Sequence, residues 1–292
     1  MVSLGACPMF DPLRIALVAE GPTDRVVVEA AVNAMLPDRP FVLTQVQPEG
    51  SLVFGELGGG WVGVYRWCKQ ASARGGGRLS DDALLYQNYD ALILHVYSRR
   101  LGIHRSGSSQ NFTRGRVVST QHTAVHAEAS NLCNSFGVFL IFASIDADVA
   151  GYDYAEGSIE PDPGDAQLPC ERPCPPAHDT TNALRSVVLS WCGEQAVPKR
   201  TVFCLPSKST EAWVVAALFP DDKSMEGHIE CWPRPESRLG QQPKKLRIRK
   251  SQRDYKDRVS DIEEAWSRLT EPGAIGKALR FQNELLAELT TL

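Results

Sequence analysis

The sequence predicts an α/β protein with a largely parallel sheet flanked by helices. Short apolar segments with strand character alternate with segments whose apolar residues recur at helical spacing. Two strand segments, at residues 89–97 and from residue 137 onward, are almost continuously apolar, which is typical of strands buried on both faces of a parallel sheet. This alternation indicates a series of βα units.

The predicted elements follow one another regularly over the first 220 residues. Strands are expected at 14–20, 41–47, 89–97, 137–148 and 200–206, and helices at 24–36, 61–73, 123–136, 180–194 and, after a short loop, up to residue 220. Thr23 or Asp24 can cap the first helix, because a short side-chain oxygen satisfies free amide groups of the first turn.

The chain divides into two predicted parts. Residues 1–220 form the α/β domain, interrupted by a long polar insertion at about 96–144 and a proline-rich loop at 157–179. Residues 221–292 form a basic, helical C-terminal region, with helices expected at 260–270 and 274–292.

Composition favours a cytoplasmic protein that does not enter membranes. No apolar run is long enough to cross a bilayer, and the N-terminal residues do not read as a secretory signal. The eight cysteines are scattered, several of them within apolar runs, and we interpret them mostly as reduced core thiols. The net charge of −4 does not by itself indicate a nucleic-acid-binding protein, so any such surface must be local.

Acidic residues follow two of the apolar strands. Asp146 and Asp148 end the strand that begins at residue 137, and residues two apart lie on the same side of a strand. Two neighbouring carboxylates repel each other unless a cation lies between them, and Mg²⁺ prefers such oxygen ligands. Glu20 ends the first strand and would lie at the same edge of a parallel sheet. These residues predict a Mg²⁺ or Mn²⁺ site, although each acid could instead belong to a turn or a helix cap.

Together the segments LVAEGPTDRVVVEAAV and FLIFASIDADVAG resemble the Toprim superfamily, most closely the small OLD-family nucleases of bacterial defence. The resemblance implies a Toprim-like (Rossmann-like) catalytic domain within residues 1–220. It implies that Glu20 acts as an acid/base group or metal ligand and that Asp146 and Asp148 hold Mg²⁺. It also implies a nuclease that cleaves DNA or RNA in anti-phage defence. Because the chain lacks the phosphate-binding loop G-x-x-x-x-G-K-[ST], an ATPase partner would be a separate chain.

A further candidate follows the strand at 200–206, in the segment LPSKSTEAW. Strands followed by Glu-x-Trp at the start of a helix also occur in small Toprim-like proteins. On this reading Lys208 contacts a phosphate as a catalytic residue, and Glu211 joins the metal ligands. The alternative is a capping box, in which Ser207 or Ser209 and Glu211 only satisfy the free amide groups of the helix start.

Two other segments suggest binding sites. The C-terminal region contains a basic stretch that could bind the phosphates of DNA or RNA, or could simply be a solvated face, with candidate residues Lys244, Lys245, Arg247, Arg249 and Lys250. Cys170, Cys174 and His178 have a spacing that could hold Zn²⁺, but unpaired cysteines in a proline-rich loop are the commoner explanation.

The sequence therefore favours a Mg²⁺-dependent nuclease over two rivals. One is a metal-dependent nucleotide-sugar transferase, in which Asp146 and Asp148 would bind a sugar-nucleotide diphosphate. That hypothesis leaves Glu20 and the basic stretch unexplained. The other is a non-catalytic nucleic-acid-binding or scaffold subunit. The sequence also leaves room for a homo-oligomer.

Overall fold

The computed structural model describes residues 12–48, 57–74, 139–221 and 229–291. Within these residues the strands form a four-stranded sheet of order β2-β1-β3-β4, in which every pair is parallel. The predicted strand at 89–97, the predicted helix at 123–136 and most of the predicted insertion at 96–144 lie outside the described residues. The predicted α/β class with a parallel sheet flanked by helices is confirmed.

The strands form where apolar and β-branched residues are concentrated. They are β1 (Leu13–Val18), β2 (Phe41–Gln47), β3 (Phe139–Ser144) and β4 (Thr201–Cys204). The central strand β1 pairs with both β2 and β3, so that Ala16 lies opposite Thr44 on one side and Ile141 on the other. The chain therefore runs from β1 outward to β2 and then returns past β1 to β3.

The helices agree with the predicted segments and add two short ones. They are α1 (Pro22–Met35), α2 (Gly60–Arg74), α5 (Ala177–Trp191), α6 (Glu211–Leu218), α7 (Pro235–Gln241), α8 (Gln252–Lys256), α9 (Val259–Leu269) and α10 (Gly276–Leu289). The 3₁₀ helices η1 (Ala147–Gly151) and η3 (Ile229–Cys231) complete the described elements. The helix α1 starts at Pro22 with Gly21 as its N-cap residue. The side chain of Asp24 accepts a hydrogen bond from the N–H of Gly21, so Asp24 satisfies a free amide group at the helix start as predicted, although it is not itself the N-cap residue.

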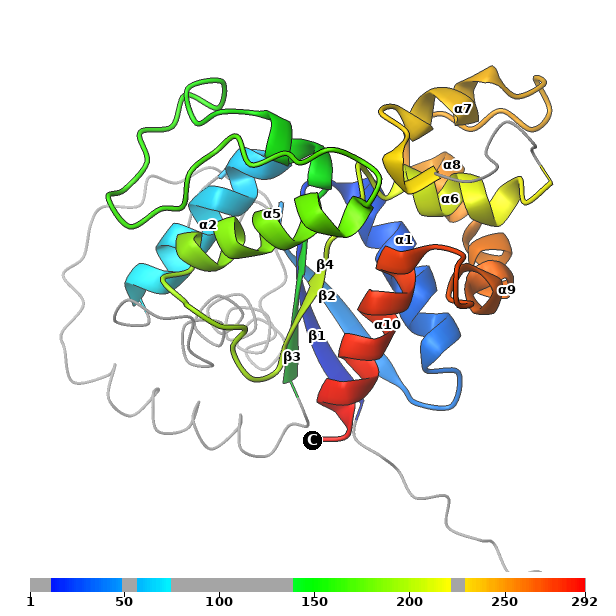
Figure 1. The fold of residues 1–292 in the computed structure, drawn as a ribbon. Helices are drawn as coiled ribbons and strands as arrows, with labels where there is room; N and C mark the ends of the chain where they lie inside the picture. Colours follow the sequence, from blue (N-terminus) through cyan, green and yellow to red (C-terminus); the bar gives the residue numbers. More distant parts are fainter. Residues whose placement is uncertain (1–11, 49–56, 75–138, 222–228, 292) are drawn as a thin grey trace, which may run out of the picture.

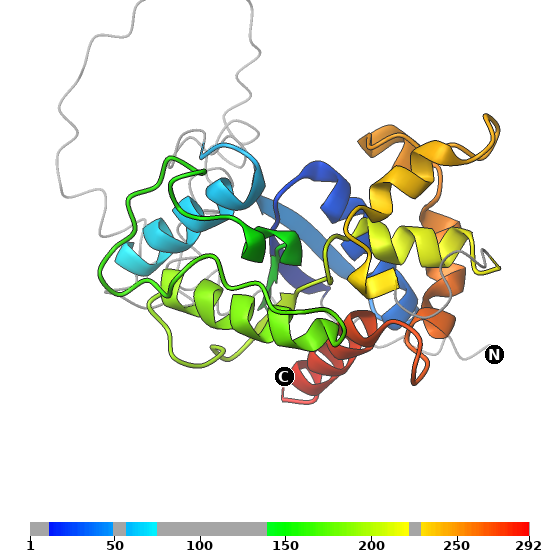
Figure 2. The ribbon, with the colours of Figure 1, turned by 45° about the horizontal axis from the view of Figure 1, so that its top comes forward.

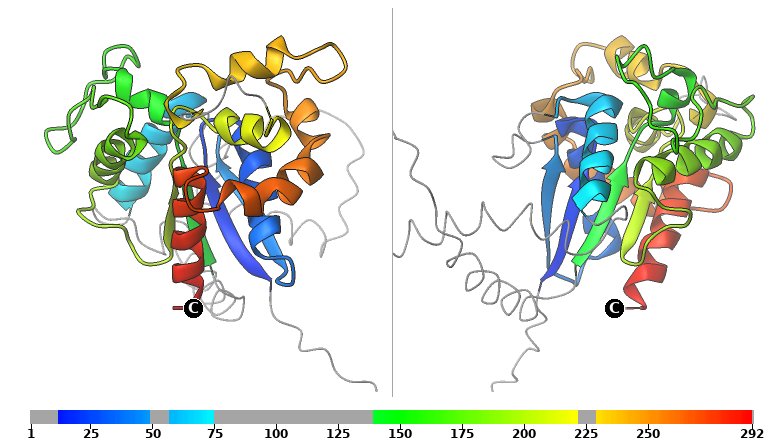
Figure 3. Two further views of the ribbon diagram at one scale, coloured as in Figure 1. Left: turned by 45° about the vertical axis from the view of Figure 1, so that its right-hand side comes forward. Right: turned by 90° about the vertical axis from the view of Figure 1, so that its left-hand side faces the viewer.

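The sheet separates two hydrophobic cores. Along β3, Leu140 and Phe142 face one core, whereas Ile141 and Ala143 face the other, because successive side chains of a strand point to opposite faces. Helices α2 and α5 cover one face of the sheet, and α1, α6, α9 and α10 cover the opposite face (Figures 1 and 3). The described residues thus form a three-layer α/β/α arrangement.

The C-terminal helices belong to the core of the α/β domain. Phe281 of α10 packs edge-to-face on Phe142 of β3, with ring centroids 5.5 Å apart. Trp213 of α6 packs against both Trp266 of α9 and Phe281, at 5.6 and 6.1 Å. The predicted boundary at residue 220 therefore does not coincide with a division of the hydrophobic core. Among the helices that the structure describes, none has the length and apolar character needed to cross a membrane.

Candidate metal centre at the ends of β1 and β3

At one place in the sheet, the connections that follow two neighbouring strands lead away to opposite sides. The chain leaves β1 toward β2 on one side, and it leaves β3 toward β4 on the other side. Loops diverge at such a point, and open α/β sheets bind their ligands in the crevice that results at the carboxyl ends of the strands. Figure 2 looks onto this end of the sheet, where η1 and the first turns of α1 and α6 lie around the strand ends.

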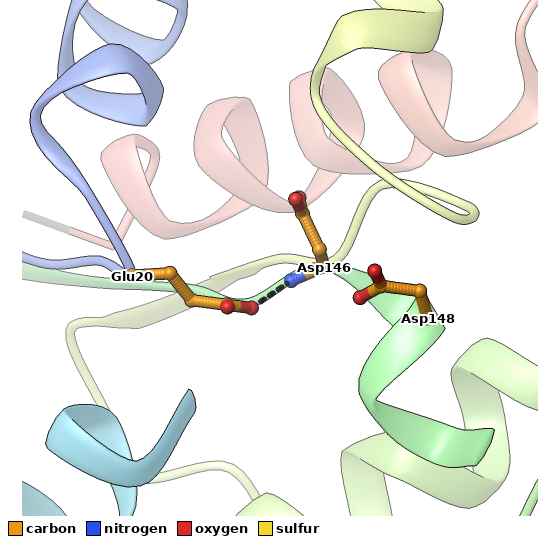
Figure 4. Close-up of side chains that lie close together, drawn as sticks. All are labelled: Glu20, Asp146 and Asp148. Atoms are coloured by element: carbon orange, nitrogen blue, oxygen red, sulfur yellow. Dashed lines mark hydrogen bonds between the residues drawn. The ribbon is translucent and has the colours of Figure 1, made fainter. Parts of the chain in front are cut away.

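Three acidic side chains meet at this point. Glu20 follows β1, and Asp146 and Asp148 follow β3 (Figure 4). Each offers a carboxylate oxygen within 4.8 Å of the other two. Oxygens on opposite sides of one Mg²⁺ lie about 4 Å apart, so a small movement of the side chains would bring all three into reach of a single ion. The cluster could bind a divalent metal ion.

Backbone hydrogen bonds position the cluster. The backbone N–H of Asp146 donates to Glu20 Oε1 at 2.8 Å, which ties the two strand ends together. Asp146 Oδ1 accepts from the backbone N–H of Thr210 at 3.0 Å. The carbonyl oxygen of Glu20 accepts from the N–H of Gly60, the first residue of α2, at 2.8 Å. Contacts from three different loops thus fix the Glu20–Asp146 pair.

Asp146 and Asp148 lie beyond the end of β3, not on the strand as the sequence pattern suggested. The strand β3 ends at Ser144, and Asp148 lies within the 3₁₀ helix η1 rather than on a strand. Asp146 is buried, whereas Asp148 is exposed. The expectation that the two residues share one face of a strand is therefore wrong, and the tight turn into η1 brings them together instead.

A second group of acidic residues extends the cluster into the protein. Asp24 is only 4% exposed and Glu211 is fully buried. Asp24 Oδ2 accepts from the N–H of Gly21 at 2.8 Å, and Asp24 Oδ1 accepts from Thr210 Oγ1 at 2.8 Å. Since Thr210 also binds Asp146, this threonine links the two acidic groups. Sequence reasoning missed Asp24 as a site residue because its helix-start position suggested a cap.

Glu211 is held from the C-terminal region. Its Oε1 accepts from the hydroxyl of Tyr255 at 3.0 Å and forms an ion pair with Lys250 Nζ at 3.1 Å. Its Oε2 is buried and has no hydrogen-bond partner among the described residues. A buried carboxylate oxygen without a partner is costly, and a bound cation would satisfy it. The N-cap residue of α6 is Thr210, without a side-chain cap bond, so the capping-box alternative for Glu211 is wrong.

Burial and mutual repulsion hold protons on the cluster. Burial, assisted by the charges of Asp24 and Asp148, raises the pKa of Glu20 to about 8. Burial and Glu211 raise the pKa of Asp24 to about 6. Burial, together with Asp24 and Glu20, raises the pKa of Asp146 well above its ordinary value. Such a cluster is poised to exchange protons for a metal ion, because ligand carboxylates must be ionised to bind one.

Lys250 places a positive charge beside Glu211. Burial alone would lower its pKa, but Glu211, Asp146 and Asp24 raise the pKa above its ordinary value, so the ammonium group stays charged. Lys208, the lysine predicted to be catalytic, pairs instead with Glu171 on the proline-rich loop, at 2.5 Å. Of the two candidate lysines, Lys250 is therefore the one paired with an acid of the cluster.

The other residues predicted to bind nucleic acid lie outside the acidic cluster. Lys244, Lys245, Arg247 and Arg249 are exposed on the segment between α7 and α8 that ends at Lys250.

The zinc hypothesis is wrong for Cys170, Cys174 and His178. Cys174 forms a disulfide with Cys231, and Cys170 remains a free thiol. The only described group of three or more suitably close ligands is the one at Glu20, Asp146 and Asp148. Cys174 and Cys231 are therefore not the reduced thiols that the sequence suggested. Cys68, Cys192 and Cys204 are free and buried as expected.

Comparison with known proteins assigns no family to this chain. No protein-family description matches it, and neither the curated proteins nor the solved structures include a significant match.

Proposed function

We propose that this protein is a divalent-metal-dependent nuclease of the Toprim type, which hydrolyses phosphodiester bonds of DNA or RNA. The observation that carries the proposal is the meeting of Glu20, Asp146 and Asp148 at the ends of two parallel strands. The Glu-Gly and Asp-x-Asp segments that resemble the Toprim superfamily contribute these three residues.

The acidic residues would hold one or two Mg²⁺ or Mn²⁺ ions. Glu20, Asp146 and Asp148 form the outer ligand group, and Asp24 and Glu211, with its unpartnered Oε2, supply the inner one. Metal bound at such a site lowers the pKa of a coordinated water and neutralises charge on a scissile phosphate. The hydrogen bonds from Asp146 to Glu20 and from Thr210 to Asp24 and Asp146 keep these carboxylates in place before any substrate arrives.

Lys250 takes the role that the sequence suggested for Lys208. Its ammonium group pairs with Glu211, while its side chain remains 56% exposed and can approach a phosphate at the cluster. A fixed positive charge beside a developing negative charge stabilises the transition state. Lys208 instead positions the loop before α6 through its pair with Glu171.

The exposed basic segment would bind the nucleic acid. Lys244, Lys245, Arg247 and Arg249 directly precede Lys250, so phosphates bound along the segment would lead toward the acidic cluster. Binding by such charges should weaken steeply with salt and depend little on sequence.

A cleavage screen tests the proposal. Purified protein is incubated with single-stranded DNA, double-stranded DNA, plasmid and transfer RNA, each with Mg²⁺, with Mn²⁺ or with EDTA. We expect cleavage of at least one substrate that requires the metal and is lost in Glu20→Ala and in Asp146→Ala/Asp148→Ala. The matched control is Asp38→Ala, which removes an exposed aspartate beyond the far end of α1 and should retain full activity.

The rival functions give different results in the same screen. Hydrolysis of a sugar nucleotide without cleavage of any nucleic acid would favour the transferase. Salt-sensitive binding of DNA or RNA without cleavage under any divalent metal would favour a scaffold subunit. A role in anti-phage defence beside a separate ATPase follows from the Toprim resemblance alone, and co-purification of such a partner from the native host would support it.

A further inference from the structure

A disulfide joins the segment that precedes α5 to the 3₁₀ helix η3. Cys174 lies in the proline-rich segment before α5, and Cys231 is the last residue of η3. The two cysteines are 57 residues apart in the sequence. Between them in the sequence lies the loop of residues 205–210, which connects β4 to α6 and is referred to here as the β4–α6 loop.

The segment that contains Cys174 contacts this loop and the metal-site helix η1. The backbone N–H groups of Cys170 and Glu171 both donate to the carbonyl oxygen of Ala150 in η1, at 2.8 and 2.9 Å. The carboxylate of Glu171 pairs with Lys208 of the β4–α6 loop. This segment is therefore attached to both the helix of Asp148 and the loop beside it.

The segment that contains Cys231 contacts the other part of the loop. The carbonyl oxygen of Glu230 accepts a hydrogen bond from Ser207 Oγ. The carboxylate of Glu230 accepts from the N–H groups of Gly276 and Lys277 at the start of α10, at 3.0 and 2.8 Å. Because α10 packs on the sheet, this segment gives the β4–α6 loop a fixed support.

The β4–α6 loop in turn holds the acidic cluster. The N–H of Asp148 donates to the carbonyl oxygen of Lys208 at 3.1 Å, and the N–H of Thr210 donates to Asp146. Lys208 has a φ of +64°, a left-handed conformation that is unfavourable for a residue other than glycine. Such a conformation persists only where the surrounding structure enforces it. The contacts of Glu171 and Glu230, joined by the disulfide, supply that enforcement.

We propose that the Cys174–Cys231 disulfide is a redox switch that controls the order of the β4–α6 loop and thereby the divalent-metal affinity of the acidic cluster. A dithiol reductant would break the S–S bond, deliver two electrons and two protons to form two thiols, and itself become a disulfide. The loop would then lose the link between its two supports, and Lys208 would relax from its left-handed conformation. Disulfides are rare in cytoplasmic proteins, the class that the sequence predicts, and those that form are usually transient, with a catalytic or redox-sensing role.

The experiment compares oxidised full-length protein with protein reduced by dithiothreitol, which is then removed without air. Mass spectrometry of peptides establishes the state of Cys174 and Cys231. Hydrogen exchange measures the protection of amides 207–211, and electron paramagnetic resonance of free Mn²⁺ gives the metal affinity. We expect reduction to lower the protection of this peptide and to weaken Mn²⁺ binding at least tenfold. Cys174→Ser and Cys231→Ser should match the reduced protein and not respond to reductant.

Cys170→Ser is the matched control, since Cys170 is a free thiol in the same segment, and it should behave as the wild type does. Equal amide protection in the two redox states, or no disulfide-linked peptide after oxidation, would overturn the switch. The effect on metal affinity rests on the proposed metal site. If neither form binds Mn²⁺, that site is refuted, while hydrogen exchange still decides whether the disulfide orders the loop.

Discussion

Replacing Glu20 with glutamine should stabilise the metal-free protein at alkaline pH, although it removes a proposed metal ligand. The glutamine oxygen can still accept the hydrogen bond from the N–H of Asp146. It carries no charge, so the repulsion from Asp24 and Asp148 and the cost of burying a carboxylate both disappear. A carboxylate that serves metal binding should lower the stability of the metal-free protein in this way, whereas a carboxylate that serves the fold should not.

The size of the effect follows from the pKa of Glu20, which burial raises from 4.5 to about 8. Because the folded-state pKa lies above the unfolded one, the unfolded chain loses the proton first, and stability falls as the pH rises from about 4.5 to about 8. At about 1.4 kcal/mol for each pH unit, the full cost would reach about 5 kcal/mol. Water and counterions reach this half-buried side chain and reduce the cost, and we expect a gain of about 2 kcal/mol at pH 8.5.

Thermal unfolding in EDTA measures this gain. Glu20→Gln should melt about 5 °C above the wild type at pH 8.5, given about 2–4 °C for each kcal/mol in a protein of this size. The difference should shrink toward pH 5, where Glu20 is protonated in the folded protein. Glu29→Gln removes the same charge from a partly exposed position on α1, where Glu29 forms only a surface ion pair with Arg25, and should change the melting temperature by less than about 1 °C. A Glu20→Gln protein that is destabilised, or whose gain does not depend on pH, would refute the reasoning.

Three further predictions concern the metal, the lysine and the core. Mn²⁺ affinity should rise between pH 6 and pH 8.5 and binding should release protons, measurable by calorimetry in two buffers, because Glu20 must ionise to bind; affinity independent of pH would contradict this. Lys250→Met should lower the cleavage rate by about 10²-fold or more with little change in nucleic-acid affinity, whereas Lys245→Met should mainly weaken binding at physiological salt; equal behaviour of the two variants would argue against a catalytic lysine. Phe281→Ala should destabilise the protein by about 3–5 kcal/mol in urea unfolding, in contrast to Leu286→Ala at an exposed position of the same helix; a small effect would mean that α10 is not part of the core.

Most of the secondary structure of the described residues could be predicted from local pattern, with the short helices α7 and α8 as exceptions. The apolar segments at 14–20, 41–47 and 200–206 contain strands because β-branched residues suit a buried, extended backbone. The meeting of Glu20 with the Asp146–Asp148 pair could also be anticipated. The carboxyl ends of parallel strands lie at one edge of the sheet, so acids that end two such strands come close if the strands are neighbours.

Other features depend on contacts between distant residues and have no local signal. The sequence identifies Asp24 only as a helix cap, and its link to the acidic cluster through Thr210 becomes visible only in the structure. Lys250 reads as one member of a basic stretch until its pairing with Glu211 is known. Cysteine spacing cannot identify the partner of Cys174, because pairing depends on the separation of the two residues in space.

The sequence by itself thus determined the α/β class, most of the described elements and the strand-end acids Glu20, Asp146 and Asp148, since periodicity and strand ends are properties of short segments. Only the tertiary structure decided that β3 pairs with β1, that the C-terminal helices share the core with the sheet, and that Lys250 and Tyr255 reach the same carboxylate. The physical reason is that the packing of α6, α9 and α10 fixes which residues, far apart in the chain, meet at the strand ends.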